Sequence, residues 1–453
     1  MTTTARPEKR RRRNAETPAA ASIPDDVLIS HVFWRLPVDS LMRVKFVCRS
    51  WRAAIEDPSF IRRHLELSHA RGPPSFLVVP RAEDADNASV SEDVSFHRLL
   101  LDAARAPETA NVELVFETAV SDMTNAIRPT HCDGLVALAT ATEKVFVCNP
   151  ATREFVALPP GTRDARPIKD RAPAAALGYD ASRDRYVVAR YFYREYREFK
   201  DAGGKRWLDF DIGHEVFTLG GDGDGSWELT DDPPHAIAAA RPICTRDAFY
   251  WCTDHLGPNV LLRFGLRDRA FDVVPFPPGV HFDVDHSKDH VTELSGKLCY
   301  AHPATKTAFD VWIAHDDGPR LEWSLRCRVD FDDYGGGVSS CQVDQEDDFD
   351  DSDDDYGTDD SDIGSQALLP VTAAGDEILI AADHSKLYSY DAMHRSVRKV
   401  VDMEKELAYA RPDGSLYYDG LVHHVVPYVE SLVPIGNKKM QIPLTRLRNA
   451  RTC

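Results

Sequence analysis

Residues 23–68 contain a series of helix signals and more apolar side chains than a fold of this size can bury. Pro24 marks the first helix start, because proline is tolerated in the first helical turn. Asp25 and Asp26 add negative charge at the positive end of the helix dipole. Pro37 ends this helix. Apolar residues at helical spacing lie between these limits: Val27, Leu28, Val32 and Leu36.

Two more helices are predicted in the same stretch. Asp39 or Ser40 is expected to cap the second helix, since a short polar side chain can accept a hydrogen bond from the free amides of the first turn. The third helix begins at Asp57 and Pro58, an N-cap residue followed by proline. The second helix presents an apolar face at spacings of three and four residues: Leu41, Val44, Cys48, Trp51 and Ile55.

Met42, Phe46 and Val47 lie off that apolar face. A fold of fewer than about fifty residues has only a marginal core, so a second apolar face needs a partner. Either this face packs on the remainder of the chain, or it is a docking surface for another protein. The pattern alone leaves both interpretations open.

The order and spacing of these residues resemble the F-box. Its usual run is a Leu-Pro, a short helix that ends in Leu-Pro, and then a leucine, a Val-Cys pair and a tryptophan. The sequence departs from this run at Ile23, where leucine is commoner, and at His31, where glutamate is usual. The resemblance implies that residues 23–68 bind the Skp-type adaptor of a Skp–Cullin–F-box ubiquitin ligase, and through it the cullin. It implies the following adaptor-binding residues: Ile23, Pro24, Leu28, Val32, Leu36, Pro37, Leu41, Phe46, Val47, Cys48 and Trp51.

Length and charge limit the classes of function. A chain of 453 residues is expected to contain more than one domain. Its net charge of −19 argues against nucleic-acid or anionic-membrane partners. Much of that charge lies between Asp344 and Asp362, where twelve of nineteen residues are acidic. We expect this insert (342–366) to be a solvated, disordered loop, because it is too polar to bury a core.

Cysteine usage and the ends of the chain bear on localisation. The nine cysteines form no C-x-x-C pair, which is typical of reduced thiols in the nucleus or cytoplasm. We expect no signal peptide and no membrane span, since no apolar run approaches about 18 residues. The basic run Lys9–Arg13 is either a nuclear-import signal or a solvated part of a disordered tail (1–22). A second basic tail is expected at 436–453.

The pattern changes after Pro74, and residues 72–435 read as short strands between turns, with one helical turn expected near Val94 to Ala104. Many short strands at regular spacing indicate an all-β sandwich, barrel or propeller. The strand-like runs include Phe76–Val79, Val112–Phe116, Leu135–Ala139, Val145–Cys148 and Tyr186–Ala189.

A weak internal repeat favours the propeller. Residues 149–155, 265–271 and 391–397 each follow an apolar strand, turn, place an arginine and return to a strand. Hairpins that recur in this way are typical of propeller blades, because each blade buries its faces only against its neighbours. At roughly 40–50 residues per blade, about seven blades are predicted, and six or eight stay open.

This second part is similar to the plant F-box-associated domain. The resemblance rests on Cys132-Asp133-Gly134-Leu135, on Asn149-Pro150-Ala151-Thr152-Arg153 and on Leu177-Gly178-Tyr179-Asp180, with a later echo at Tyr428-Val429-Glu430-Ser431-Leu432. The order of the two domains is also that of the family. The resemblance implies a kelch-like propeller that captures a target protein.

Few motifs suggest chemistry. The glycine-rich run 220–225 lacks the Gly-Lys-Ser/Thr ending of a phosphate loop, so a hairpin turn is predicted there. Asp283 and His286 belong to the densest polar cluster, which is either a metal or enzymatic site or an exposed loop. No nucleophile, base and orienting group occur at a readable spacing, so no catalytic residue, metal or cofactor is predicted.

The sequence therefore predicts an α+β multidomain protein, with a small N-terminal helical F-box followed by an all-β propeller. Its predicted function is that of a non-enzymatic substrate receptor in a ubiquitin ligase, without nucleic-acid or membrane partners. Two alternatives stay open: an F-box scaffold or sequestering protein without ubiquitylation, and a propeller enzyme with its site near Asp283 and His286.

Overall fold

The computed structural model describes residues 24–70, 75–82, 93–100, 111–167, 174–200, 206–220, 225–278, 290–305, 307–315, 321–331, 368–374, 376–382, 385–410, 416–417 and 420–436. Several of the predictions concern residues outside these ranges. They are Ile23, the basic run Lys9–Arg13, the acidic run 344–362, Asp283 with His286, and most of the C-terminal tail.

The N-terminal part is helical, as predicted, but the predicted second helix is two separate helices, because Cys48 is the N-cap of a new helix that begins at Arg49. Its elements are α1 (Asp25–Val27), the π-helical turn η1 (Leu28–Val32), the 3-10 turn η2 (Phe33–Arg35), α2 (Val38–Val44), α3 (Arg49–Ile55) and α4 (Pro58–His69). The Asp57 carboxylate caps α4 by accepting a hydrogen bond from the Ser59 amide at 2.9 Å, and Pro58 is the first helical residue. The predicted cap of α2 by Asp39 or Ser40 is wrong, because its N-cap is Pro37, which has no capping side chain.

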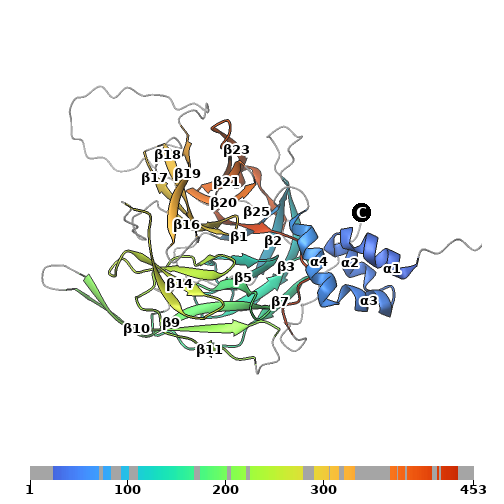
Figure 1. Ribbon diagram of the computed structural model, residues 1–453, viewed down its shortest axis with the longest axis horizontal. Helices are drawn as coiled ribbons and strands as arrows, with labels where there is room; N and C mark the ends of the chain where they lie inside the picture. Colours follow the sequence, from blue (N-terminus) through green and yellow to red (C-terminus); the bar gives the residue numbers. More distant parts are fainter. Residues whose placement is uncertain are drawn as a thin grey trace, which may run out of the picture.

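The remainder forms six four-stranded antiparallel sheets in the described residues, arranged as the blades of a propeller (Figure 1). Blade 1 consists of β26 (Leu421–Tyr428), β1 (Ser75–Ala82), β2 (Asp93–Leu100) and β3 (Asn111–Ala119). Blade 2 consists of β4 (Thr130–Cys132), β5 (Leu135–Ala139), β6 (Val145–Asn149) and β7 (Glu154–Ala157). Blade 3 consists of β8 (Ala176–Asp180), β9 (Arg185–Lys200), β10 (Arg206–Thr218) and β11 (Glu228–Leu229).

The other three blades follow the same order. Blade 4 consists of β12 (Ile243–Cys244), β13 (Ala248–Cys252), β14 (Val260–Gly265) and β15 (Phe271–Pro275). Blade 5 consists of β16 (His290–Leu294), β17 (Lys297–Pro303), β18 (Ala308–His315) and β19 (Glu322–Asp330). Blade 6 consists of β20 (Leu368–Ala374), β21 (Glu377–Ala382), β22 (Lys386–Asp391) and β23 (Ser396–Asp402). The short elements α5 (Met403–Glu406), β24 (Tyr409–Ala410) and β25 (Leu416–Tyr417) lie between β23 and β26 in the chain.

Two sequence predictions need correction here. The described residues form six blades rather than about seven, a number that the sequence left open, and blade 3 uses more residues than the assumed 40–50. In blade 3 alone, β9 and β10 have 16 and 13 residues. The helical turn expected near Val94 is also wrong, since residues 93–100 form β2, whose Val94, Phe96 and Leu99 are buried.

The ring is closed by strands from both ends of the domain. The C-terminal strand β26 pairs with β1 from Leu421–Ala82 to Tyr428–Ser75, so it becomes the innermost strand of blade 1. Each innermost strand contacts the innermost strands of the two neighbouring blades. Their order around the ring is β26, β4, β8, β12, β16 and β20, and β20 contacts β26 again. Strands such as β5 and β6 are buried at every position because both faces of a blade pack against neighbouring blades.

The two ends of the central channel differ. Apart from β26, each innermost strand is followed by a turn, and these turns include Asp133 and Asp184, which contact helix α4. We call this the F-box end. The linkers that lead into the innermost strands therefore lie at the opposite end, which we call the open end. The long β9–β10 hairpin also points toward the open end, away from the helices (Figure 1).

Candidate functional site

The F-box has a small core to which the propeller contributes. Trp51 packs edge-on against Phe33, with ring centroids 5.0 Å apart. Leu432, which follows the last propeller strand, is buried in the same cluster. The buried members of the core are Phe33, Val38, Leu41, Ile55, Phe60 and Leu432.

The turn between α2 and α3 presents an apolar surface to solvent. Phe46 is 79% exposed and Val47 is 64% exposed, and Val32 on η1 is 42% exposed. Of the other residues predicted to bind an adaptor, Pro24, Pro37 and Cys48 are exposed, and Leu28, Leu36 and Trp51 are half-buried. Leu41 is fully buried, so in this structure it supports the surface from below. Val27, which the sequence prediction omitted, is also exposed.

Helix α4 attaches the F-box to the propeller and lies between the propeller and the other helices (Figure 1). Arg62 forms an ion pair with Asp184 at 3.0 Å, and His69 lies 3.0 Å from the Asp133 carboxylate. Burial alone would raise the pKa of Asp133, but hydrogen bonds from His69 and Tyr186 outweigh it and hold that pKa below its usual value. Ile61 and Leu65 add apolar contacts to blades 2 and 3.

The segment that follows β26 forms a second attachment. The Glu430 carboxylate pairs with Arg98 of β2 and accepts a hydrogen bond at 2.9 Å from the Val38 amide of α2. The Asn149 side-chain amide donates to the carbonyl oxygens of Ser431 at 3.0 Å and Val433 at 2.9 Å. Residues 430–433 are therefore fixed to both the propeller and the F-box.

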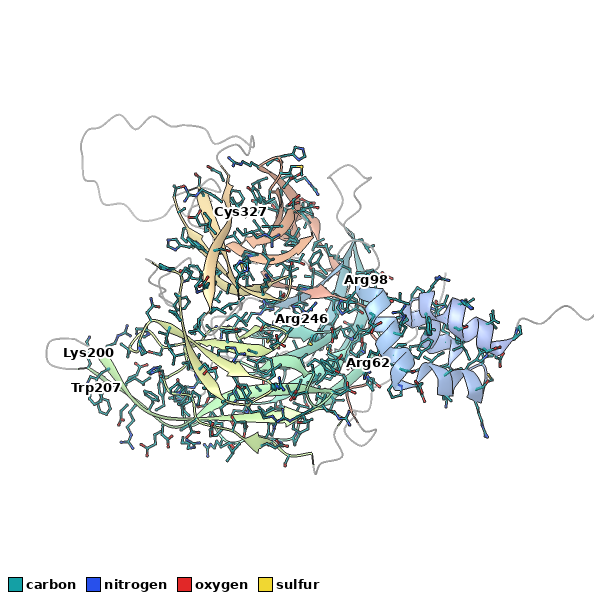
Figure 2. The ribbon with its side chains drawn as sticks, in the orientation of Figure 1. Arg62, Arg98, Lys200, Trp207, Arg246 and Cys327 are labelled. Atoms are coloured by element: carbon teal, nitrogen blue, oxygen red, sulfur yellow. The ribbon has the colours of Figure 1, made fainter. Side chains whose placement is uncertain are left out.

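The open end carries a projecting arm, residues 194–200 and 206–211 of the β9–β10 hairpin. Phe199 pairs with Trp207 across the two strands, and their rings stack with centroids 4.3 Å apart. Phe199 is 38% exposed and Trp207 is 49% exposed. In Figure 2, Trp207 and Lys200 lie at the opposite side of the molecule from Arg62 and Arg98. The arm thus presents an aromatic pair far from the F-box.

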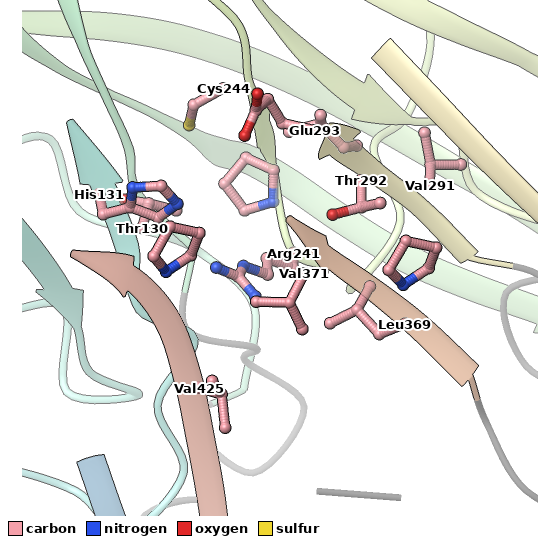
Figure 3. Close-up of a pocket in the computed structure, with 14 residues that line it drawn as sticks. Thr130, His131, Arg241, Cys244, Val291, Thr292, Glu293, Leu369, Val371 and Val425 are labelled. Atoms are coloured by element: carbon pink, nitrogen blue, oxygen red, sulfur yellow. The ribbon is translucent and has the colours of Figure 1, made fainter. Parts of the chain in front are cut away.

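The central channel forms a narrow cavity of about 40 Å³ between five of the innermost strands (Figure 3). Its polar lining includes His131, Arg241 and Glu293. Burial lowers the pKa of His131 to about 4, so its ring is neutral at pH 7. Burial also lowers the pKa of Arg241, and burial raises that of Glu293. These groups were not singled out by the sequence analysis.

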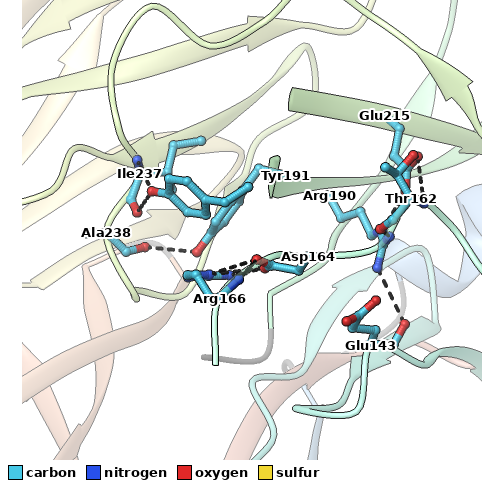
Figure 4. A network of polar contacts seen from close by, with 10 residues as sticks. Glu143, Thr162, Asp164, Arg166, Arg190, Tyr191, Glu215, Ile237 and Ala238 are labelled. Carbon is cyan, nitrogen blue, oxygen red and sulfur yellow. Dashed lines mark hydrogen bonds and ion pairs between the residues drawn. The ribbon is translucent and has the colours of Figure 1, made fainter. Parts of the chain in front are cut away.

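Two buried ion pairs fix the linker between β7 and β8 at the open end (Figure 4). Glu215 of β10 pairs with Arg190 of β9 at 2.6 Å and accepts a hydrogen bond from the Thr162 amide at 3.0 Å. Asp164 pairs with Arg166 at 2.6 Å, and the Arg166 guanidinium lies over the Tyr193 ring at 4.8 Å. The linker is therefore held against blade 3 by charges that have partners.

Metal-binding groups, cysteines and membrane-spanning helices were considered in the sequence predictions, and the described residues bear on all three. No group of three or more histidine, cysteine or acidic side chains is placed there to hold a metal ion. Asp283 and His286 lie outside the described residues, whereas the nearby His290 begins β16. The seven cysteines in the described ranges are free thiols. None of the described helices combines the length and the hydropathy that crossing a bilayer requires.

Comparison with known proteins agrees with both parts of the fold. Residues 93–330 match the F-box associated beta propeller domain, and residues 20–67 match the F-box-like domain. The F-box protein CPR1 of Arabidopsis thaliana is 24% identical over 334 residues, which cover 67% of this chain and 72% of that protein. Two other proteins of the same plant, the F-box proteins At1g26515 and At5g10340, are 26% and 25% identical and cover 66% and 70% of this chain, and 79% and 71% of their own lengths. The chain therefore belongs to the family of F-box proteins with an F-box associated β-propeller domain.

Proposed function

We propose that this chain is the substrate-recognition subunit of a Skp–Cullin–F-box ubiquitin ligase. F-box domains generally bind Skp-type adaptors, and F-box proteins are typically adaptors rather than enzymes. The proposed adaptor site is the apolar surface around Phe46, Val47 and Val32. The proposed target site is the open end of the propeller, including the aromatic arm.

One observation supports this proposal: the two exposed apolar surfaces lie in different parts of the molecule, one on the F-box helices and the other on the β9–β10 hairpin at the open end. Phe46 and Val47 are exposed, and α4 and residues 430–433 fix the helices at the F-box end. This arrangement leaves the open end free to hold a target (Figure 2). Burying a phenylalanine or valine side chain stabilises a complex by about 1.5–3 kcal/mol, so an adaptor that covers Phe46 and Val47 gains substantial affinity.

In this role the chain contributes no catalytic group of its own. The cullin assembly holds a ubiquitin-loaded conjugating enzyme, and the propeller holds the target close to it. Proximity then raises the effective concentration of acceptor lysines. We place this activity in the nucleus or the cytoplasm, since free thiols and the basic run Lys9–Arg13 are compatible with both.

The test measures capture of a purified Skp-type adaptor by the full-length chain. Two variants change the proposed surface: Leu36→Ala with Pro37→Ala, and Phe46→Ser with Val47→Ser. The second pair is exposed, so it removes apolar contact area without opening the core. We expect both to lose adaptor binding, because each lost contact costs on the order of 1–3 kcal/mol.

A matched control is Leu229→Ser, which removes an apolar side chain that is 65% exposed on the outer strand of blade 3. This variant should bind the adaptor at the wild-type level. Wild-type adaptor binding by the folded Phe46→Ser, Val47→Ser protein would overturn the assignment of the surface. Adaptor binding without ubiquitylation of any co-purified protein would favour a sequestering role instead.

A further inference from the structure

The projecting arm extends beyond the strands that flank it in blade 3. Next to β9, strand β8 pairs only with residues 185–189. Next to β10, strand β11 pairs only with Glu215 and Val216. Within the described residues the arm therefore has two strands, and the outer edge of residues 206–211 has no neighbouring strand. A two-stranded hairpin has only marginal stability of its own in water, and an open edge can hydrogen-bond to a further strand.

The two edges of the arm differ in their side chains. Four of the six residues 195–200 along β9 are charged, and charged side chains on an edge oppose pairing with another strand. Along β10, residues 206–211 include Trp207, Leu208 and Phe210. Trp207 is 49% exposed and Phe210 is 36% exposed. Apolar and aromatic side chains stabilise paired strands, so the β10 edge is the better place for an added strand.

Apolar side chains lie on both faces of this edge. Successive side chains of a strand point to opposite faces, so Trp207 and Leu208 lie on different faces. On the first face, Trp207 stacks against Phe199 with ring centroids 4.3 Å apart. On the second face, Phe210 is paired with Tyr196 across the two strands, and Leu208 is half-buried. An added strand would contact apolar groups on both of its faces.

The tip of the arm carries positive charge. Lys200 and Arg206 are directly opposite each other in the strand register, and like charges at such positions repel. Both are exposed, and neither forms an ion pair within the described residues (Figure 2). The turn 201–205 lies outside those residues. Three basic residues and one acidic residue in the sequence 200–206 leave a net charge of +2 at the tip.

The acidic groups of the described arm lie nearer the propeller. Each has a basic or hydroxyl group beside it: Glu195 has Arg197, Glu198 has Tyr196, Asp209 has Arg197, and Asp211 has Arg194. The two cations at the tip lack such a neighbour. A partner that brings a carboxylate to the tip is therefore favoured over a basic one.

We propose that the arm binds an extended segment of the target protein as a third strand along residues 206–211 of β10. The segment has apolar or aromatic side chains beside Trp207 and Phe210, and a carboxylate beside Arg206 and Lys200. Main-chain hydrogen bonds hold the added strand, and its side chains give the selectivity. This inference rests on the proposed function, because it takes the target as the occupant.

Two other occupants fit the same edge less well. A second copy of the chain offers no free carboxylate in its described arm, since its Asp209 and Asp211 already have arginines beside them. An anionic membrane would be repelled by the net charge of −19.

The experiment titrates the full-length protein into the fluorescein-labelled peptide Thr-Val-Thr-Val-Phe-Glu-Glu and follows fluorescence anisotropy. In antiparallel pairing this peptide places its phenylalanine beside Trp207 and its glutamates at the tip. A control peptide has glutamine in place of both glutamates. We expect the acidic peptide to bind about tenfold more tightly at low salt, and the difference to shrink at high salt. No binding of the acidic peptide would overturn the proposal.

Two variants at exposed positions change the arm without opening the core. Trp207→Ser should weaken binding of both peptides about tenfold, and Lys200→Gln with Arg206→Gln should remove the preference for glutamate. Arg267→Gln, in an exposed turn of blade 4, and Val273→Ser, 49% exposed on β15, are the matched controls and should bind as the wild type does. Equal affinity of Trp207→Ser and wild type for the acidic peptide would overturn the site.

Methylated peptides test the strand pairing itself. One peptide is N-methylated at its odd-numbered residues and another at its even-numbered residues. Alternate amides of a strand point to the same side, so only one of the two sets can face β10. We expect one methylated peptide to lose binding and the other to keep it. Equal effects of the two sets would overturn the strand pairing.

Further measurements distinguish the target from other occupants. A dimer in analytical ultracentrifugation that Trp207→Ser abolishes would assign the arm to a second copy. Binding to phosphatidylserine vesicles that the same variant loses would assign it to a membrane. Peptide binding that appears only after residues 344–362 are replaced by a Gly/Ser linker would assign it to the chain's own acidic run. Each of these results overturns the proposal. Adaptor capture is measured on the same samples, so failure of the ligase role is seen separately from failure of the arm.

Discussion

The Glu430 carboxylate accepts a hydrogen bond from the backbone amide of Val38 at 2.9 Å, so a residue at the end of the last propeller strand caps a helix of the F-box. The same carboxylate pairs with Arg98 of β2. One side chain thus connects α2, blade 1 and the segment that carries Leu432 into the F-box core. The relative position of the adaptor surface and the propeller depends on this connection.

Glu430→Ala should therefore weaken the attachment of the F-box. The variant removes both the cap of α2 and the partner of a half-buried arginine, and we expect the free energy of unfolding to fall by about 1–3 kcal/mol. Chemical denaturation and proteolysis between the two domains measure this effect. Glu113→Ala is the control, since Glu113 lies 3.8 Å from the same Arg98 but is largely exposed. Equal stability of the two variants would contradict the role given to Glu430.

Local signals predicted the F-box well because they act over a few residues. Asp57 and Pro58 cap and open α4 as the sequence indicated. The cap of α2 was not predictable in this way, since its acceptor is 392 residues away in the sequence. Such a contact exists only after the ring has closed and β26 has paired with β1.

The internal repeat was correctly located, and its three copies lie in alternate blades. Arg153, Arg269 and Arg395 have positive φ angles of 61°, 54° and 52° in the turns between the third and fourth strands of blades 2, 4 and 6. The three copies thus lie two blades apart. Blades 3 and 5 have different sequences between their third and fourth strands, so this repeat identifies three of the six blades.

Three arginines in linkers at the open end share a sequence signal that the predictions did not use. Arg128, Arg166 and Arg241 are each followed by proline in a linker that leads into an innermost strand. Nothing in the sequence shows that, among the described residues, Arg166 forms an ion pair and the other two do not. That difference depends on Asp164, whose carboxylate faces Arg166 across one turn.

The buried pair of Arg190 and Glu215 leads to a second prediction. Both side chains are almost fully buried, and Glu215 also holds the Thr162 amide and hydroxyl. Glu215→Ala leaves a buried charge without a partner, which costs about 3–5 kcal/mol. Urea denaturation should show this loss. Asp232→Ala breaks the exposed pair with Arg194 and should cost no more than about 1 kcal/mol. A small effect of Glu215→Ala would mean that the linker is held by other contacts.

The acidic run 344–362 gives a third prediction. It lies outside the described residues, and its interpretation as a solvated loop stays a prediction. Replacing it by a short Gly/Ser linker should leave the melting temperature and target capture nearly unchanged, because long surface loops cost little free energy. If the acidic run instead attracts a basic target, its removal would slow target association more than about tenfold at low salt, and the difference would vanish at high salt.

Three buried histidines make the stability of the fold dependent on pH. Burial lowers the pKa of His97 and His131 to about 4 and that of His214 to about 3. In the unfolded chain each ring titrates near 6.5. Between pH 6.5 and 4 the unfolded chain therefore binds protons that the folded chain does not, so stability falls as the pH is lowered through this window. Above pH 6.5 both states hold neutral rings and the effect disappears.

His214→Phe tests the contribution of one ring. His214 packs against Phe264 with centroids 4.4 Å apart, so a phenylalanine keeps the aromatic contact while it removes the titrating group. The slope of unfolding free energy against pH between 6.5 and 4 should decrease by on the order of 1 kcal/mol per pH unit. His31→Gln, at an exposed position of the F-box, should leave the slope unchanged. An unaltered slope in His214→Phe would show that this ring is already protonated in the folded protein, contrary to the lowered pKa that its burial implies.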